Sequence, residues 1–358
     1  MTLERVGVVG TGLIGTSIGL ALTRRGVAVA LVDVDAGHAA AAAALGAGDV
    51  ADGVALLECD HIIVAVPPSQ VPVVVGDLVR LNVRATISDV SSVKSNVLDE
   101  IRRLVPHPDR FCGGHPIAGR ERGGPGFAQP ELFEHAVWAV TPLPATSREA
   151  VADVEALARL CGARPVTVSP DLHDRLLAVV SHAPQLAASA LAGLLSTADG
   201  LAPALAGAGF RDTTRLADSD PDLWADITAA NSGALAPVLR RLSAVLSGVA
   251  DALDEGDRSA VADLIAVGRR QRARLPGKPR AVARPALSRV GVVLADRPGE
   301  LARLLAAAGA AGVNVEDLAI EHAPDHPVGF VDLEVAADSA DVLLEALSSA
   351  GWAAHRTS

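Results

Sequence analysis

Three glycines near the start of the chain have the spacing of a phosphate-binding turn. Gly10, Gly12 and Gly15 form the pattern GxGxxG in the segment GTGLIG, between an expected strand and an expected helix. The first glycine would permit a tight turn, the second a close approach to a pyrophosphate, and the third close packing of helix on strand. The pyrophosphate would lie at the helix N-terminus, where free N–H groups and the helix dipole favour an anion. The alternative is a glycine-rich turn that holds no ligand.

An acidic residue at the end of the second expected strand indicates which dinucleotide would bind. Asp33 follows Gly15 by 18 positions, and its carboxylate would accept hydrogen bonds from the adenosine ribose and repel a 2′-phosphate. No Arg or Lys follows at 34–39, so NAD is favoured over NADP. Val66 and Pro67 end a later strand and either contact the cofactor or begin an ordinary loop. The residues expected to line the cofactor site are Gly10, Thr11, Gly12, Leu13, Ile14, Gly15, Asp33, Val66, Pro67 and Ser91.

A histidine in a second glycine-rich segment is the best candidate for an acid–base group. His115 lies in GGHPIAGRERGG (113–124), in an expected loop at the carboxyl edge of the sheet, where open α/β sheets bind ligands. A histidine between glycines and a proline does not fill a core, and a neutral imidazole can accept a proton near pH 7. The segment DVSSVKSN (89–96) follows the preceding expected strand. We therefore interpret His115 as a functional residue.

These segments, in this order, resemble the prephenate dehydrogenase family over residues 5 to about 255. The matching blocks are GTGLIG, DVSSVK, GGHPIAG, HDRLLAVVSH (173–182) and GFRDTTRLADSDPDLW (209–224). The resemblance implies that His115 takes the proton of the ring hydroxyl of prephenate as a hydride leaves the same carbon for NAD. Loss of the ring carboxylate as carbon dioxide then gives 4-hydroxyphenylpyruvate, a step in tyrosine biosynthesis.

The resemblance also implies roles for other matching residues. Ser92 would orient the imidazole of His115. Arg215 would grip the side-chain carboxylate of the substrate, because the guanidinium fork suits a carboxylate. Supporting positions around the substrate are implied for His182, Glu121, Asp212, Ser219 and Trp224.

Several of these residues also have simpler interpretations. Glu121 and Asp212 could be surface carboxylates. Ser219 could cap the helix that begins near Pro221, and Trp224 could pack in the core or at a dimer interface.

Two further positions in the helical blocks bear on the site. His173 lies nine residues before His182, two and a half helical turns away, so we expect it on the opposite face and assign it a structural role. In SHAPQ (181–185) the family often has a second histidine where this chain has Gln185. That difference concerns substrate preference and not the class of reaction.

The elements that position these residues form three folded segments. Residues 1–169 alternate strands with helices, which predicts a Rossmann-type doubly wound parallel sheet with helices on both faces. Residues 170–275 carry long Ala/Leu helical patterns and predict an all-α domain for dimerisation and substrate binding. Residues 276–286 indicate a proline-containing linker. Residues 287–358 have the order strand, helix, strand, strand, helix, strand of a ferredoxin-like unit.

The C-terminal segment resembles an ACT domain, a module that binds amino acids. In ADRPGELARLLAAAGAAGVNVEDL (295–318) the turn Pro298–Gly299 and the residue Asn314 match the pattern of this family. The resemblance implies that paired copies bind a free amino acid at the turn, where backbone N–H groups can hold a carboxylate. Tyrosine is the expected effector for this pathway. The alternative is a module that only forms dimers.

Composition excludes several other classes of protein. A formal net charge of -11 without a long basic stripe argues against nucleic-acid binding. Three cysteines without a CxxC pair predict neither a disulfide framework nor a metal site. The N-terminus runs straight into a strand pattern, and no unbroken apolar stretch of about 18 residues indicates a membrane span. We therefore expect a cytoplasmic protein without a membrane partner, and the long apolar helices indicate a homodimer.

Three alternative functions remain to be weighed. An arogenate dehydrogenase, or an enzyme that accepts both substrates, would carry the same motifs because the two substrates share the ring and the side-chain carboxylate. A β-hydroxyacid dehydrogenase would need a lysine in the helical domain, and residues 95–277 contain none. A catalytically inactive sensor of NAD and an amino acid would have no need of Ser92, His115 and Arg215 together.

Overall fold

The structure is a computed structural model that describes residues 3–357 except 82, 106–107, 119–122, 276–285 and 323–327. The chain divides into two compact units, Met1–Ala273 and Arg274–Ser358. The boundary predicted at residue 169 therefore falls inside the first unit. Most of the predicted linker, 276–285, lies outside the described residues.

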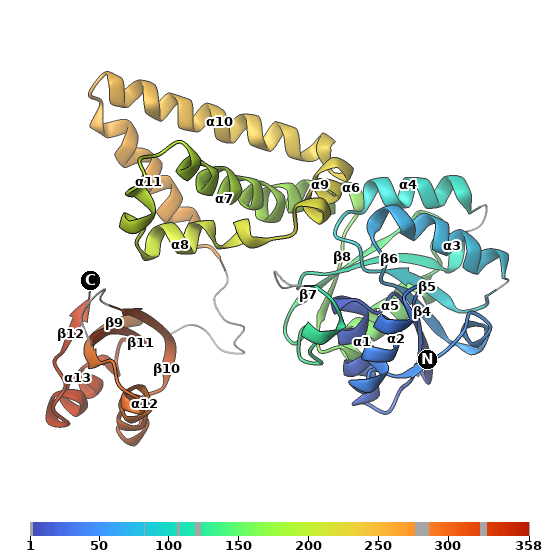
Figure 1. Cartoon of the computed structure of the whole chain (residues 1–358), viewed down its shortest axis with the longest axis horizontal. Helices are drawn as coiled ribbons and strands as arrows, with labels where there is room; N and C mark the ends of the chain where they lie inside the picture. The colour runs from blue at the N-terminus through green and yellow to red at the C-terminus, as the bar shows by residue number, and fades with distance from the viewer. Residues whose placement is uncertain are drawn as a thin grey trace. The chain divides into compact units, whose positions relative to one another are not determined.

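Among the described residues, eight strands of the first unit form one sheet in the order β3-β2-β1-β4-β5-β6-β7-β8 (Figure 1). The run from β3 to β6 is the Rossmann order, in which the chain reverses its direction of winding between β1 and β4. Ligands of such sheets bind at that switch point, beyond the carboxyl ends of the strands. The strands are β1 Arg5–Val9, β2 Ala28–Val32, β3 Asp49–Val50, β4 His61–Val64, β5 Thr86–Asp89, β6 Phe111–Pro116, β7 Val137–Pro142 and β8 Arg164–Thr167.

The sequence predicted a parallel sheet, but one pair of neighbouring strands is antiparallel. Strands β1 to β6 pair in parallel, but β6 pairs with β7 antiparallel, and β7 pairs with β8 in parallel. A parallel connection needs a crossover of a dozen or more residues, usually a helix, to return the chain to the starting edge. The described residues between β6 and β7 contain only the 3-10 turn η4 (Pro125–Phe127), so the chain enters β7 from the carboxyl edge.

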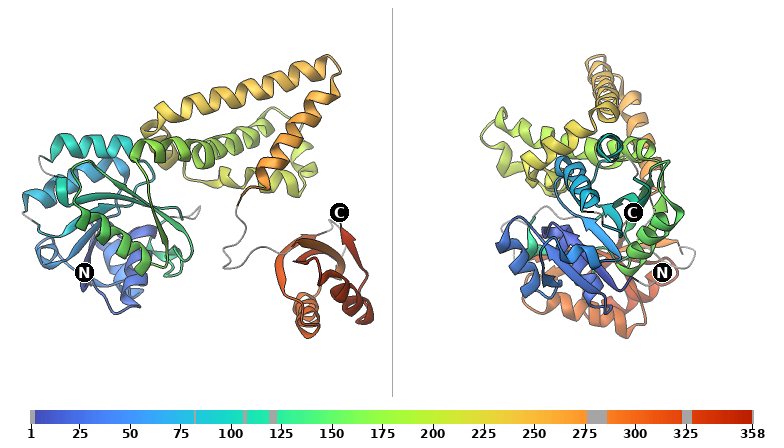
Figure 2. Two further views of the ribbon diagram at one scale, coloured as in Figure 1. Left: turned by 180° about the vertical axis from the view of Figure 1, so that it is seen from behind. Right: turned by 90° about the vertical axis from the view of Figure 1, so that its right-hand side faces the viewer.

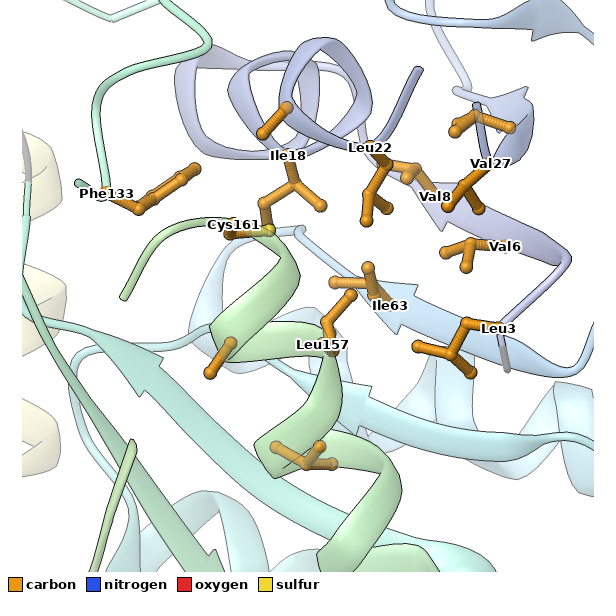
Figure 3. Packing of buried hydrophobic residues seen from close by; sticks show 14 of the residues in the cluster. Leu3, Val6, Val8, Ile18, Leu22, Val27, Ile63, Phe133, Leu157 and Cys161 are labelled. Carbon is orange, nitrogen blue, oxygen red and sulfur yellow. The ribbon is translucent and has the colours of Figure 1, made fainter. Parts of the chain in front are cut away.

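Helices cover both faces of the sheet because its strands are apolar on both sides. Ile63 of β4 belongs to one hydrophobic core, together with Ile18 of α1 and Leu157 of α5 (Figure 3). Its neighbour Ile62 belongs to the opposite core, beneath α3 and α4. This alternation is the period of a strand buried on both faces. The helices are α1 Leu13–Thr23, α2 Ala36–Ala44, α3 Val71–Arg80, α4 Ser95–Leu104 and α5 Arg148–Leu160.

The rest of the first unit is helical, as predicted, and its longest helix buries few of its apolar side chains. Helix α10 contacts α6, α7, α9 and α11 (Figure 1), yet only Leu235 of its 23 residues is buried. By length and composition alone, Pro170–Ser196 and Ser232–Asp254 could cross a membrane, a test that core helices of soluble proteins also pass. The helices are α6 Pro170–Leu177, α7 Ala183–Gly193, α8 Ala208–Thr214, α9 Pro221–Ala230, α10 Ser232–Asp254 and α11 Arg258–Arg272.

The second unit is a four-stranded antiparallel sheet, in the order β10-β11-β9-β12, with two helices on one face (Figure 2). Leu304 of α12 and Leu343 of α13 pack with Val292 and Leu333 of the strands in its own core. A separate core of this kind is expected of a segment that folds as a unit. Its elements are β9 Leu287–Ala295, α12 Glu300–Ala310, β10 Val315–His322, β11 Val328–Ala336, α13 Ala340–Ser349 and β12 Ala354–Thr357.

Candidate active site

The glycine turn, residues 10–15, joins β1 to α1 at the switch point of the sheet. Gly10 has φ +96°, and a Cβ there would lie 2.4 Å from the carbonyl oxygen of Ala65. A Cβ on Gly15 would lie 1.9 Å from the carbonyl oxygen of Gly10. The fold itself therefore requires these two glycines. A Cβ on Gly12 would meet no atom within 4 Å, so packing within the protein does not require a glycine at this position.

The open space at Gly12 adjoins an uncapped helix N-terminus. Helix α1 begins at Leu13 with no side-chain cap and no acidic residue in its first turn. Its first N–H groups can therefore bind an anion. Leu13 itself is buried, so it would contribute its backbone and not its side chain. The turn fits the pyrophosphate of a dinucleotide.

Asp33 lies beside the glycine turn and is held there as an anion. One of its oxygens accepts hydrogen bonds from the backbone N–H of Thr11 at 2.6 Å and from the Thr11 hydroxyl at 2.8 Å. The other accepts from the backbone N–H of Asp35 at 2.9 Å. Burial alone would raise the pKa of Asp33, but these hydrogen bonds hold it below its ordinary value. A fixed carboxylate at this place suits a ribose diol and opposes a 2′-phosphate.

His115 lies at the same sheet edge, on a strand and not in the loop that we expected. It is the fifth residue of β6 and is 9% exposed. The glycines before it had suggested a loop, but they meet close contacts within the sheet. A Cβ on Gly113 would lie 2.4 Å from the Thr141 hydroxyl, and one on Gly114 would lie 2.8 Å from the Asp89 carbonyl oxygen. Since β6 is three strand spacings from β1, His115 lies ~14 Å from the glycine turn along the edge.

A buried ion pair anchors the segment that follows β5. Lys94 Nζ donates to Asp89 Oδ2 at 2.5 Å and to the carbonyl oxygen of Gly114 at 2.6 Å, and the Lys94 side chain is fully buried. Ser91 also donates to Asp89 from both its hydroxyl and its backbone N–H. Burial lowers the pKa of Lys94, and the attraction of Asp89 opposes that shift. The ion pair of Lys94 and Asp89 thus holds Gly114, the residue before His115, at the end of β5. The sequence alone indicated no role for Lys94, although it stands in the DVSSVK block.

Three histidines from three different elements meet at this edge. We call His115, His173 and His182, together with Asp174 and Asn231, the histidine cluster. His115 Nδ1 lies 2.9 Å from His173 Nε2, and His173 Nδ1 lies 2.8 Å from Asp174 Oδ1. Asn231 Nδ2 donates to the carbonyl oxygen of Asp174 at 2.9 Å and lies 3.0 Å from His182 Nδ1. All five residues are buried.

His173 was expected on the opposite face from His182, but the two residues belong to one network of contacts, and the reason is local. The chain between them forms a π-helical turn, η5 (Ala178–His182), and does not continue as an α-helix. Pro184 lies in the first turn of α7 and lacks the N–H that would close an α-helical bond. Hydrogen bonds from i to i+5 lower the rotation per residue, so the angle between the two side chains differs from that of a regular α-helix.

The environment of the cluster keeps the imidazole of His115 neutral. Burial, followed by the nearby His173 and Lys94, lowers the pKa of His115 well below its ordinary value. Burial also lowers the pKa of His182, and Asp174 opposes that shift. Because an imidazole must be unprotonated to act as a base, His115 is ready to accept a proton at neutral pH.

In the described part of the chain, the other predicted substrate residues come from several elements, and Trp224 contacts the cluster. Trp224 of α9 meets His182 edge to face, with ring centroids 6.0 Å apart. Arg215 begins the 3-10 turn η8 (Arg215–Asp218) and is exposed, as is Asp212 of α8. Ser92 is half-buried after β5, and among the described residues it makes no hydrogen bond to His115. Glu121 lies outside the described residues.

Gln185 fixes the turn that carries Arg215. This buried side chain donates to the carbonyl oxygen of Leu216 at 2.7 Å. It also lies 3.4 Å from the hydroxyl of Ser219, which in turn donates to Leu216 at 2.8 Å. The residue that departs from the expected histidine thus has a defined contact in this chain. Ser219 does not cap α9, since Asp220 caps it through the N–H of Leu223.

Two cavities open near the cluster without including it. One of about 600 Å³ is lined by residues of α4 and the start of α6, among them Arg102 and Asp171. The other, of about 370 Å³, lies between Pro68, Asn96 and Asp226. His115 lines neither cavity, so the candidate active site is located by the histidine cluster and the glycine turn and not by a cavity.

In the second unit, the predicted effector residues lie at opposite ends of the sheet. Pro298 and Gly299 follow β9, and Gly299 adopts φ +91° as the N-cap of α12. Asn314 precedes β10. The first residue of β10 pairs with β11, and the same residue of β11 pairs with the start of β9, so Asn314 lies at the end of the sheet where β9 begins. One copy of the unit does not bring these residues together.

The strand order and the uncapped glycine turn at one edge of the sheet define an α/β fold of the dinucleotide-binding class. Residues 18–167 match the family model for the nucleotide-binding domain of prephenate dehydrogenase, and residues 169–266 match the model for its dimerization domain. A probable prephenate dehydrogenase of Streptomyces niveus is 33% identical over 97% of this chain and 98% of its own length. This chain belongs to the prephenate dehydrogenase family and is an NAD-dependent oxidoreductase.

Solved structures agree with this assignment. The prephenate dehydrogenase of Aquifex aeolicus, in complex with hydroxyphenyl propionate and NAD+, is 27% identical with a TM-score of 0.68, over 76% of this chain and 99% of that one. The arogenate dehydrogenase of Synechocystis is 28% identical with a TM-score of 0.66, over 75% of this chain and 99% of that one.

Proposed function

We propose that this protein catalyses the NAD-dependent oxidative decarboxylation of prephenate to 4-hydroxyphenylpyruvate and carbon dioxide. The observation that carries the proposal is the buried, neutral His115 at the sheet edge that also carries the glycine turn. A base at this place can take the proton of a ring hydroxyl while the same carbon loses a hydride.

The residues of the glycine turn would hold the cofactor. Gly12 leaves room for the pyrophosphate, the N-terminus of α1 faces its charge, and Asp33 would accept from the ribose. Val66 and Pro67 follow β4 at the same edge and would contact the cofactor between the turn and His115. Ser91 would contribute from the end of β5. Bound NAD supplies the hydride acceptor.

The predicted substrate residues would have different roles around prephenate. His115 would accept the hydroxyl proton, and Ser92 would help to orient the imidazole. Arg215 would pair with the side-chain carboxylate, because its planar fork can form two parallel hydrogen bonds. The pocket around these groups would be completed by His182, Glu121, Asp212, Ser219 and Trp224.

Arogenate is the alternative substrate, and the arogenate dehydrogenase of Synechocystis is as similar to this chain as the prephenate enzyme of Aquifex aeolicus. Arogenate differs by an amino group on the side chain and shares the ring that His115 would act on. The test measures NADH formation with prephenate and arogenate in parallel. Turnover of prephenate supports the proposal, turnover of arogenate alone assigns the other substrate, and turnover of neither contradicts both.

We also propose that the second unit is an ACT domain, with a ferredoxin-like fold, that binds an amino acid, with tyrosine as the effector. Strand β10 is at one edge of its sheet, so a second copy can pair with it. Antiparallel pairing of the two β10 strands would bring Asn314 of one copy to the end of the sheet where Pro298 and Gly299 of the other lie. Addition of tyrosine should then reduce the rate of NADH formation, and removal of residues 287–358 should abolish that inhibition.

We propose that the protein is a homodimer in the cytoplasm. The match to a dimerization domain covers α10, whose exposed apolar side chains include Leu242, Leu246 and Leu253. Apolar side chains in such number on one helix are expected to be buried against a second copy. Sedimentation of the intact chain would distinguish a dimer from a monomer.

A further inference from the structure

His115 is the first member of a chain of hydrogen bonds that ends at a buried carboxylate. Its Nδ1 contacts His173 Nε2, and His173 Nδ1 contacts Asp174 Oδ1, at 2.9 and 2.8 Å. The two imidazoles meet edge to face at an interplanar angle of 68°, which directs each ring nitrogen to one partner. His173 is 1% exposed, so the protein encloses this chain of contacts on its inner side.

Asp174 is fixed in place and can only accept hydrogen bonds. The backbone N–H of Lys94 donates to Oδ1 at 2.9 Å, and that of Ser95 donates to Oδ2 at 2.7 Å. Burial alone would raise the pKa of Asp174, but the hydrogen bonds from His173 and these two N–H groups hold it below its ordinary value. Asp174 is therefore an anion, and His173 Nδ1 must carry the hydrogen that lies between them.

The position of that hydrogen determines the tautomer of His115. A neutral His173 with its hydrogen on Nδ1 has only a lone pair at Nε2. His115 Nδ1 must then carry a hydrogen and donate it to His173. This leaves His115 Nε2 as a lone pair, which is the form that a base requires.

We propose that His173 and Asp174 are positioning residues that act through His115: Asp174 fixes the tautomer of His173, and His173 fixes the orientation and tautomer of His115, so that Nε2 is the atom that takes the proton of the substrate. This inference rests on the proposed function, because it takes His115 as the base. When Nε2 accepts the substrate proton, the resulting imidazolium keeps its Nδ1 hydrogen bond to His173. The negative charge of Asp174, two hydrogen bonds away, stabilises the new positive charge.

A second buried histidine shows that burial alone does not create this arrangement. His61, at the opposite edge of the sheet, is fully buried on β4. Its Nε2 lies 2.8 Å from the Ser88 hydroxyl, and its Nδ1 has no hydrogen-bond partner in the described part of the chain. No anion fixes its tautomer, and a hydroxyl can donate or accept. His61 therefore provides a control for the loss of a buried imidazole.

The test compares His173→Phe, His173→Gln and the control His61→Gln in the full-length enzyme. Phenylalanine keeps the ring but removes the acceptor for His115 Nδ1, so kcat should fall about 10²-fold while the KM values for prephenate and NAD stay within about twofold. Glutamine can return an acceptor near the position of Nε2, so its kcat should lie between those of the phenylalanine variant and wild type. His61→Gln should keep the wild-type kcat.

The pH dependence of kcat/KM separates positioning from a structural role. The imidazolium of His115 loses an acceptor in His173→Phe, so the acid limb of the profile should move to lower pH, and it should return toward wild type in His173→Gln. The inference is overturned if His173→Phe keeps the wild-type kcat. It is also overturned if both His173 variants lose activity equally with an unmoved acid limb.

Two further measurements keep the outcomes distinct. Wild type and His115→Asn are assayed in parallel: no turnover of prephenate or arogenate by the wild type defeats the proposed function, and a wild-type rate in His115→Asn removes His115 as the base. If His115→Asn is inactive while His173→Phe is fully active, only the present inference fails. Should the His173 variants not fold, ¹⁵N NMR of the histidine-labelled wild-type enzyme decides. An unprotonated Nε2 on neutral His115 supports the inference, and an unprotonated Nδ1 overturns it.

Discussion

The glycine turn and the histidine cluster lie at the same edge of one sheet, but they are built in opposite ways. The glycine turn is six consecutive residues, and it offers backbone N–H groups and empty space. The histidine cluster takes its members from β6, α6, η5 and the residue between α9 and α10, and it offers side chains. The turn thus depends on the absence of atoms, whereas the cluster depends on hydrogen bonds among atoms that are present.

This difference predicts how each region responds to substitution. A site made of backbone groups tolerates substitution unless the new side chain occupies the space of the ligand or collides with other backbone atoms of the protein. A buried network of polar side chains has no such tolerance, because each lost partner leaves another group unsatisfied. Substitutions in the cluster should therefore affect the reaction, and those in the turn should affect cofactor binding or folding.

The largest effect is expected for His115→Asn. Loss of the base should lower kcat about 10³-fold and change the affinity for NAD little, since the glycine turn that would hold the pyrophosphate lies ~14 Å from His115. In the wild type the pKa of His115 is lowered, so kcat/KM should stay constant as the pH falls to about 6.5 and decrease only below that value. Steady-state kinetics and fluorescence titration with NADH would measure both. A parallel loss of NADH affinity would contradict the separation of the two regions.

Arg215→Ala should have the next largest effect, on the substrate alone. Without the guanidinium, the KM for prephenate should rise about 10²-fold with little change in the KM for NAD. Arg215→Lys should recover only part of the loss, because an ammonium cannot form the paired hydrogen bonds. An unchanged KM for prephenate in Arg215→Ala would remove this residue from the carboxylate site.

Two glycines of the turn offer a matched pair with opposite expected outcomes. Gly12→Ala adds a methyl group to open space at φ -70°, so stability should stay constant and the KM for NAD should rise roughly tenfold. Gly15→Ala must displace the Gly10 carbonyl group, so it should cost about 2 kcal/mol of stability or prevent folding. Thermal melting and NAD kinetics measure the pair. Equal loss of stability in both would show that Gly12 also serves the fold.

The same contrast explains which parts of the site could be predicted from the sequence. The glycine turn and Asp33 are encoded within about 25 consecutive residues, and the chemistry of each residue states its role. The parallel pairing of β1 to β6 also follows from alternating strand and helix patterns. His115 could be found by its type and neighbours, but its place on a strand could not, because the glycines that pack against Thr141 and Asp89 look like loop residues.

The partners of His115 could not be predicted because their positions depend on packing across the fold. His173 and His182 are brought into one network by the π-helical turn η5, which no helical periodicity describes. Asn231 at a helix start has the pattern of an ordinary cap, yet its side chain caps nothing and bonds to Asp174 and His182. Lys94 is a charged residue that would normally be exposed, and only the structure shows that Asp89 pairs with it.

The smallest expected effect concerns His61, and it separates the stability of the sheet from the chemistry of the cluster. Burial lowers the pKa of His61 to about 3, whereas an exposed histidine titrates near 6.5. As the pH falls below about 6.5, the unfolded chain gains a proton that the folded chain cannot accept, so stability decreases. Between pH 8 and pH 6 this one group should cost about 1 kcal/mol.

His61→Gln should remove that contribution while keeping a hydrogen bond to Ser88. The free energy of unfolding of the variant should then decrease by about 1 kcal/mol less than that of the wild type between pH 8 and pH 6, as measured by urea denaturation. The pH profile of its kcat/KM should match the wild type, because His115 and its partners are unchanged. If His61→Gln moved the acid limb of the activity profile instead, the pH dependence of the reaction would reflect the stability of the sheet and not the protonation of the histidine cluster.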